Sequence, residues 1–294
     1  MMKERTLRVL EFTKIRDRLA SKAMTEMGRE RCEALVPSSN MTEIQRMQAE
    51  TEEATVILQY VGASPLVPFS DVRASLTLAE KGATLSPKAL LEVAALMQSA
   101  RAARKALDTE RDNTPILKEL AQRLSTLHNV EQDITNAIIS EDEIADRASN
   151  ELMDIRRHLR GANERIKEKL NQMIRSSAFQ KYLQDPIVTM RNDRYCLPVK
   201  AEYRGSVPGL VHDQSSTGAT LFIEPMAAVE MGNELKTWAA KEKQEIERIL
   251  AALSAEIAPY ADQLRETVET LAELDYIFAK GCLLYTSPSP RDYA

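Results

Sequence analysis

Glycine is scarce in this sequence, with nine residues among 294. That is about 3%, against roughly 7% in an average protein, and both tight α/β crossovers and phosphate-binding loops consume glycine. No Gly-x-x-x-x-Gly-Lys-Ser/Thr or Gly-x-Gly-x-x-Gly pattern occurs, which excludes the two common nucleotide-binding loops from these 294 residues. Aromatic residues are also few, at 5%. The composition disfavours a β-sandwich or barrel and predicts a helical protein.

Cysteine, long apolar runs and excess positive charge are lacking as well. Cys32, Cys196 and Cys282 lie far apart, so neither a zinc site nor a disulfide framework is predicted, and a reducing cytoplasm is the expected location. No stretch approaches 18 uninterrupted apolar residues and no signal-peptide core follows the N-terminus, so we expect a soluble protein with no membrane partner. The net charge of −5 creates no global field that attracts nucleic acid. Any such contact must come from a local patch.

Helix signals dominate residues 1–143, which we predict to be a helical core domain. Apolar residues at helical spacing predict one helix over 6–35 and another over about 41–60, the latter capped by Asn40 or Thr42. The pairs Ser86-Pro87 and Thr114-Pro115 predict two further helix starts, with proline at the first helical position.

The second half changes its pattern twice. A three-four apolar spacing predicts an outgoing lever helix over 144–181, and a matching seam predicts a returning helix over 226–281, broken near Ala258 by Pro259. Between them, residues 182–225 contain short β-rich runs separated by turn residues, which indicates a small antiparallel sheet. The predicted fold is therefore mainly α: a helical core, a long antiparallel two-helix lever arm, and a small β clamp that caps the arm.

The last residues, 282–294, do not continue the returning seam and contain two Ser-Pro pairs. We interpret them as a tail that is non-native or disordered.

The sequence offers few candidates for catalytic or metal-binding residues. The three histidines are isolated, and His212 and Asp213, as neighbours on a strand, are expected to point to opposite faces, so they cannot form a dyad. A hydrolase that uses His212 is the least favoured hypothesis. No catalytic residue, metal ligand or cofactor site is predicted in this chain.

Basic residues are distributed unevenly. Residues 151–181 hold eight Lys or Arg against four acids, a net of about +4 in an acidic protein, and further cations follow in the predicted clamp. Phosphate contacts need only positioned cations, so this arm and clamp are candidates for binding a nucleic-acid backbone. The candidate clamp residues are Arg191, Arg194, Lys200 and Arg204, and the secondary candidates on the arm are Lys167, Lys169 and Arg175.

Two alternatives account for the same charges. The arm can be a solvated coiled-coil face with intrahelical ion pairs such as Glu164 with Lys167, and on charge pattern alone this is favoured. The arm can also be a structural module for protein–protein assembly.

Several strings resemble a known family. They are Arg194–Lys200 (RYCLPVK), Glu202–Arg204 and Gly209–Pro225 (GLVHDQSSTGATLFIEP), with Leu7–Phe12 and Ala79–Pro87 nearer the N-terminus. The chain over 1–281 is similar to the bacterial MutS paralogue that carries a C-terminal Smr nuclease domain.

The resemblance implies a homodimeric ATPase with a core, a lever and a clamp, followed by an ABC-type ATPase domain and an Smr endonuclease domain. ATP and Mg are expected for the full-length protein. It further implies branched or duplex DNA and the ribosome as partners, in suppression of homologous recombination and in rescue of collided ribosomes. The sequence stops before the Walker A motif, so no enzymatic activity is expected of this polypeptide alone. The expected function of the chain is sequence-independent contact with a nucleic-acid backbone.

Overall fold

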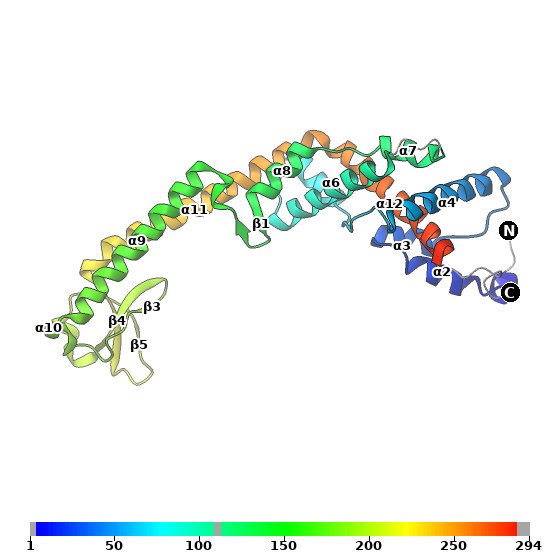
Figure 1. Cartoon of the computed structure of the whole chain (residues 1–294). Coiled ribbons are helices and arrows are strands. Elements are labelled where there is room, and N and C mark those ends of the chain that lie inside the picture. The colour runs from blue at the N-terminus through cyan, green and yellow to red at the C-terminus, as the bar shows by residue number, and fades with distance from the viewer. Residues whose placement is uncertain (1–3, 109–112, 287–294) are drawn as a thin grey trace. The chain divides into compact units, whose positions relative to one another are not determined.

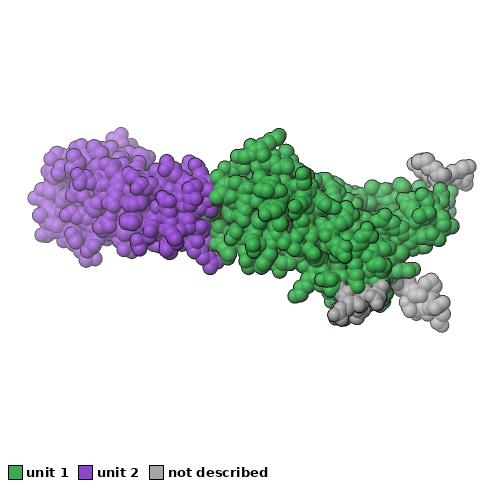
Figure 2. Space-filling model, turned by 90° about the horizontal axis from the view of Figure 1, so that it is seen from above, with its two compact units in different colours: residues 1–144, 250–294 green, residues 145–249 purple. Residues whose placement is uncertain are grey.

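The computed structural model describes residues 4–108 and 113–286, and the chain divides into two compact units. Unit 1 comprises residues 1–144 and 250–294, and unit 2 comprises residues 145–249, as the two colours of Figure 2 show. Helices dominate both units, and strands are few (Figure 1).

Unit 1 is a helical domain that the chain enters twice. The long helix α12 (Ala261–Thr286), which comes last in sequence, packs against α4, α3 and α5 from the first half. Fully buried Leu90, Leu96, Met97 and Phe278 contribute to its core. The remaining elements are α1 (Glu4–Val9), α2 (Phe12–Ala20), α3 (Glu26–Glu33), α4 (Met41–Val61), α5 (Arg73–Glu80), α6 (Pro87–Leu107), α7 (Pro115–Gln122), α8 (His128–Ala137), β1 (Ile138–Ser140) and β2 (Glu143–Ile144).

The single helix predicted over 6–35 is wrong, because the structure has three helices there. Glu11 adopts a left-handed conformation with φ of 52°, which ends α1 and starts α2. Thr25 is extended, and its hydroxyl accepts a hydrogen bond from the Gly28 amide, so Thr25 is the N-cap of α3. The apolar spacing carries no information about either break.

The other predicted starts are confirmed. Asn40 caps α4 by accepting from the Thr42 and Glu43 amides, and Ser86 caps α6 by accepting from the Ala89 amide. Pro115 occupies the first position of α7. These caps are local sequence signals, which is why a single sequence reveals them.

Two buried carboxylates extend capping across the domain. The Glu53 carboxylate on α4 accepts from the Ile116 amide at 3.2 Å and the Leu117 amide at 2.9 Å, at the start of α7. The Asp275 carboxylate on α12 accepts from the Met24 and Thr25 amides and from the Thr25 hydroxyl, just before α3. Each carboxylate is buried, and each satisfies amides that a helix start leaves without an intrahelical acceptor.

Unit 2 consists of a helix pair and a four-stranded sheet. Its elements are η1 (Asp146–Ala148), α9 (Asn150–Arg175), α10 (Ser177–Gln180), β3 (Thr189–Arg191), β4 (Arg194–Lys200), η2 (Ala201–Ser206), β5 (Gly209–Gln214), β6 (Thr220–Pro225) and the part of α11 (Met226–Ile257) up to residue 249. Contacts from Ser149 to Glu245 and from Arg165 to Glu234 run in opposite chain directions. The two helices are therefore antiparallel, as predicted, and they lie side by side in Figure 1.

The sheet has the strand order β3-β4-β6-β5, with every pair antiparallel. One face packs on the helices through Tyr195, Leu197, Val199 and Ile223, which join Ile166 and other α9 residues in one apolar cluster. The opposite face therefore carries the alternate residues of β4 and β6, among them Arg194, Lys200, Phe222 and Glu224.

The returning helix breaks where proline predicts it. The turn η3 (Ala258–Tyr260) separates α11 from α12. The helix α12 continues to Thr286, so residues 282–286 are helical, whereas a non-native or disordered tail was expected from residue 282. Residues 287–294 lie outside the described residues. Leu283 and Leu284 prolong an apolar helical pattern that the two later Ser-Pro pairs obscure. The predicted fold class, a helical core with a two-helix lever and a small antiparallel clamp, is confirmed.

Within residues 4–108 and 113–286, no helix combines the length and apolar character needed to cross a membrane. Across the same residues, no cluster of three His, Cys, Asp or Glu side chains is arranged to hold a metal ion.

Candidate nucleic-acid interface

The first four basic residues of α9 form ion pairs inside unit 2. Arg156 contacts both Asp146 and Glu242 at 2.6 Å, and Arg160 contacts Asp146 at 3.1 Å. The hydrogen bonds from the two guanidinium groups hold the pKa of Asp146 below its ordinary value. Arg157 and Arg165 are likewise paired, with Asp154 and Glu234. These arginines fix the helix pair.

The last three basic residues of α9 have no ion-pair partner among the described residues. Lys167, Lys169 and Arg175 are exposed, and none of them has a carboxylate within 4.0 Å among the described residues. The intrahelical pair predicted between Glu164 and Lys167 is not formed. Lys181, shortly after α10, is exposed and lies 4.8 Å from the centre of the Tyr182 ring. The cations nearest the sheet are thus free to meet an external anion.

Arg194, predicted as a nucleic-acid contact, instead pairs with a buried carboxylate. Its guanidinium donates to Glu224 at 3.1 Å and to the Asn233 side chain at 2.8 Å, and its side chain is only 14% exposed. His212 lies 2.8 Å from the other oxygen of Glu224, which is fully buried. A Cβ on Gly232 would lie 2.6 Å from the Glu224 carboxylate, so glycine is required for α11 to approach this closely. Arg194 acts as a structural cation.

Arg191 is paired within the sheet but remains partly exposed. Its Nε lies 3.2 Å from Asp213, and its guanidinium lies 4.0 Å from the centre of the Phe222 ring. The side chain remains 39% exposed. Its charge is balanced within the sheet, which weakens it as a phosphate contact.

A β-bulge overturns the expectation that His212 and Asp213 point to opposite faces. The register of β5 on β6 shifts between Val211 and Asp213, so His212 is an extra residue on its strand. His212 contacts Glu224, and Asp213 contacts Arg191 over Phe222. Phe222 and Glu224 share one face of β6, and so both side chains reach that face. They still form no dyad, because each has a different partner.

The two remaining clamp candidates differ. Arg204 is exposed but donates to the carbonyl oxygens of Val207 at 3.4 Å and Gly209 at 3.2 Å, where it braces the turn that leads into β5. Lys200, at the end of β4, has no carboxylate partner among the described residues and is half-exposed. We call Lys167, Lys169, Arg175 and Lys200 the free-cation set.

An aromatic stack on the helix pair was not predicted. The His158 ring on α9 lies 4.4 Å from the Trp238 ring on α11, nearly parallel to it, and Lys241 lies over the same indole. A pocket of about 760 Å³ opens beside this stack. A single sequence does not show which residues of two helices face each other, so it does not predict this stack.

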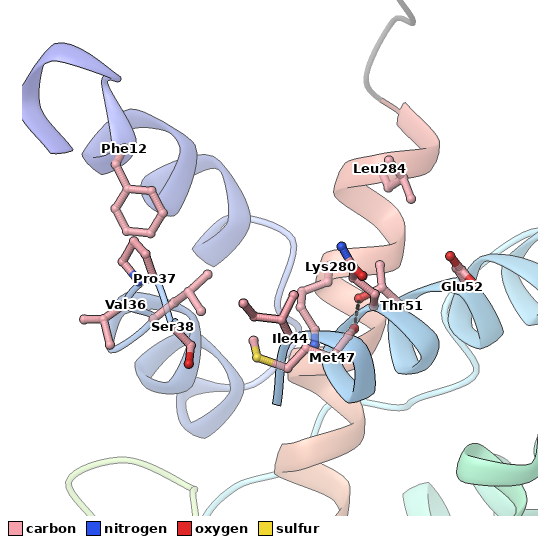
Figure 3. A pocket seen from close by; sticks show the side chains of 12 residues that line it. Phe12, Val36, Pro37, Ser38, Ile44, Met47, Thr51, Glu52, Lys280 and Leu284 are labelled. Atoms are coloured by element: carbon pink, nitrogen blue, oxygen red, sulfur yellow. Dashed lines mark hydrogen bonds between the residues drawn. The ribbon is translucent and has the colours of Figure 1, made fainter. Parts of the chain in front are cut away.

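Unit 1 contains a separate pocket of about 510 Å³ with mostly apolar walls (Figure 3). Phe12, Val36 and Pro37 line one side, and Met47 and Lys280 lie across from them. Burial lowers the pKa of the Lys280 amine, while Glu50, at 3.5 Å, opposes that shift. Lys280 is thus paired with Glu50, and the exposed Glu52 also lines the mostly apolar pocket.

Comparisons with known proteins identify close relatives, although no family model matches the chain. Endonuclease MutS2 of Acetivibrio thermocellus is 46% identical over 287 residues, which is 96% of this chain and 36% of that protein. Endonuclease MutS2 of Alkaliphilus oremlandii is 48% identical over 284 residues, 96% of this chain and 36% of that protein. The protein of the same name from Symbiobacterium thermophilum is 47% identical over 282 residues, 96% of this chain and 35% of that protein.

The chain thus spans about one third of the length of the curated relatives it matches. The helical core, the antiparallel lever and the small clamp agree with the family suggested by the clamp strings. The resemblance found in the sequence is confirmed: over nearly all of its length, this chain is homologous to the MutS2 proteins, as an N-terminal fragment of one would be.

Proposed function

We propose that unit 2 contacts a nucleic acid through its sugar–phosphate backbone, without reading base sequence. The observation that supports this most directly is the charge balance of α9. Its first four basic residues are paired internally, whereas Lys167, Lys169 and Arg175 have no carboxylate partner among the described residues. These three cations are therefore available to a phosphate group, whereas the four paired arginines are already neutralised inside unit 2.

The chemistry of the free-cation set suits phosphate more than bases. Lysine and arginine on exposed helix positions meet phosphate oxygens as charged donors and carry no direct sequence information. Each phosphate neutralised releases condensed counterions, which makes the affinity depend on salt. Binding by this chain alone should therefore be weak and salt-sensitive.

The proposed nucleic-acid contact would be one part of a longer protein. We infer that a full-length protein of this kind is a cytoplasmic homodimer that uses ATP and Mg to close the clamp on its partner. The candidate partners are branched or duplex DNA, in suppression of homologous recombination, and ribosomal RNA, in rescue of collided ribosomes. The relatives are named endonucleases, and nuclease activity of the whole protein belongs to the same proposal.

Fluorescence anisotropy with a labelled four-way DNA junction, a duplex DNA and an RNA hairpin tests this function. The slope of log affinity against log salt between about 50 and 200 mM is expected to be clearly negative for the wild-type chain. The triple variant Lys167→Gln, Lys169→Gln, Arg175→Gln should reduce the magnitude of that slope by about 2 to 3, since each phosphate contact contributes about 0.9. The relative affinities for the three probes identify the preferred nucleic acid.

A matched control neutralises Lys81 and Lys105 of unit 1, which are exposed and lack ion pairs among the described residues. That variant should bind as the wild type does. If the wild-type chain shows no salt-dependent binding to any probe, the function is wrong, and the alternative of a coiled-coil assembly module is favoured. Arg194 is left unchanged in this test, because its charge is needed inside the fold.

A further inference from the structure

Three chain segments meet at the end of the sheet where β4 finishes. The Lys200 amide donates to the Tyr182 carbonyl at 3.0 Å, and the Ala201 amide donates to the Ala219 carbonyl at 3.0 Å. Lys200 is paired in register with Thr220, so the two side chains share a face of the sheet. This arrangement places Lys200 next to the turn that joins β5 to β6.

That turn is held by its own hydrogen bonds. The Gly218 amide donates to the Ser215 carbonyl at 2.8 Å, and the Ser215 amide donates to the Thr220 carbonyl at 2.9 Å. The Ser215 hydroxyl accepts from the Thr220 amide at 3.1 Å. Gly218 has φ of 71°, a conformation that glycine adopts without strain. The turn is therefore ordered before any ligand arrives.

The two central residues of the turn keep unused donors. Ser216 and Thr217 are exposed, and in the part of the chain that the structure describes their backbone amides have no acceptor. The turn from Ser215 to Ala219 contains no charged side chain. The turn thus offers two amide donors and no charged side chain, and Lys200, next to it in register, has no carboxylate partner among the described residues. Such a set of donors complements an anion that presents several oxygens.

The other end of the same sheet shows the contrast. There, Glu224 neutralises Arg194. An anion gains little at that end, since its approach meets a carboxylate already paired with the cation.

We propose that Lys200 and the backbone amides of Ser216 and Thr217 form a binding site for one phosphate group of the nucleic-acid backbone. We call these three residues the phosphate corner. The ammonium supplies the charge, and the two amides donate to the non-bridging oxygens. This inference rests on the proposed function and adds to it a contact through neutral donors, which the free cations of α9 do not supply.

A salt titration distinguishes the charged donor, Lys200, from the neutral amide donors. Lys200→Gln removes one charge and should lower affinity about tenfold at 100 mM salt, with a decrease of about 1 in the magnitude of the salt slope. Lys200→Arg should restore both values. Thr217→Pro removes one amide donor and no charge, so it should weaken binding several-fold while the slope stays unchanged. Lys243→Gln, an exposed lysine of unit 2 without an ion pair among the described residues, is the matched control.

The double variant Lys200→Gln, Thr217→Pro shows whether both groups contact one phosphate. Its loss of affinity should be smaller than the product of the two single losses, because either change already weakens the same contact.

Ser216→Pro repeats the amide test at the neighbouring residue, and Trp238 fluorescence during urea unfolding checks that each variant is folded. If the wild type binds in a salt-dependent way and the Lys200 variant and both proline variants bind equally well, the phosphate corner is wrong. The proposed function is unaffected by that result. Absence of wild-type binding would remove both.

Discussion

Three buried carboxylates, Glu53 and Asp275 in unit 1 and Glu224 in unit 2, show two different kinds of compensation. Other buried carboxylates of unit 1, Glu50 and Glu131, pair with cations as Glu224 does. In unit 1, Glu53 and Asp275 accept hydrogen bonds from backbone amides at helix starts. In unit 2, Glu224 accepts from the guanidinium of Arg194 and lies 2.8 Å from His212. The first arrangement joins secondary-structure elements and uses no cation. The second uses cations that would otherwise be available at the surface.

This difference explains why counting basic residues does not locate a binding surface. Unit 2 has a basic sequence, but part of its charge is absorbed by Glu224, Asp213, Asp146 and Glu234. What remains for a ligand is the set of cations that no carboxylate reaches.

Each unit carries one buried thiol that can report on it separately. Cys32 belongs to unit 1 and Cys196 to unit 2, and burial raises the pKa of the first to about 12 and of the second to about 11. Both should resist a thiol-labelling pulse until their own unit unfolds. The urea midpoint for labelling of each cysteine therefore measures the stability of its unit.

Glu224→Gln should have the largest effect and should act on unit 2. Removing one partner of a buried ion pair leaves Arg194 uncompensated, which costs about 3–5 kcal/mol of unfolding free energy. We expect the labelling midpoint of Cys196 to fall and that of Cys32 to stay in place. Glu230→Gln, at an exposed residue of the same region without an ion pair among the described residues, serves as the control. Equal midpoints for the Glu224 variant and the wild type would show that the pair does not hold the clamp.

Asp275→Asn should have an intermediate effect confined to unit 1. The amide retains one acceptor oxygen but brings an NH₂ group towards the Met24 and Thr25 donors, at a cost of about 1–3 kcal/mol. The Cys32 midpoint should fall, with Cys196 unchanged. Asp262→Asn, at a highly exposed carboxylate of the same helix, should leave both midpoints within error. A shift of both cysteines together would mean that the units unfold as one.

The smallest expected effect is on the pH dependence of unit 2 stability. Hydrogen bonds from Arg248 and Ser149 hold the pKa of Glu245 below its ordinary value of 4.5. A carboxyl with a lowered pKa in the folded state stabilises it above its unfolded pKa, and this contribution is lost as the pH falls towards the folded pKa. Glu245→Gln should therefore flatten the decline in unit 2 stability between about pH 5 and pH 3. The Cys196 midpoint, measured across that range, checks the slope, and an unchanged slope would contradict the pairing.

Much of the fold follows from local signals. The caps at Asn40 and Ser86, the proline at the start of α7 and the break before Tyr260 are each set by residues within a few positions of one another. The breaks within residues 6–35 and the hairpin of β1 and β2 were missed, because apolar spacing continues through a left-handed residue and two or three residues make too short a strand pattern.

The candidate site was less accessible to sequence reasoning. Lys200 and Arg194 lie on one strand with similar surroundings in sequence, yet Arg194 faces a carboxylate 30 residues away and Lys200 faces none among the described residues. That distinction depends on strand register, and the bulge at His212 alters the register further. The role of Gly232 beside Glu224 was likewise out of reach.

The discontinuity of unit 1 has a consequence for synthesis. Unit 2 is one continuous stretch, residues 145–249, whereas unit 1 needs residues from both sides of it. The start of α3, formed early, has its buried acceptor in Asp275, some 250 residues later. During translation, at roughly 5–20 residues per second, the clamp unit is complete in the nascent chain before the core that precedes it can close. Until α12 is translated, the Met24 and Thr25 amides lack the acceptor that Asp275 supplies in the folded core.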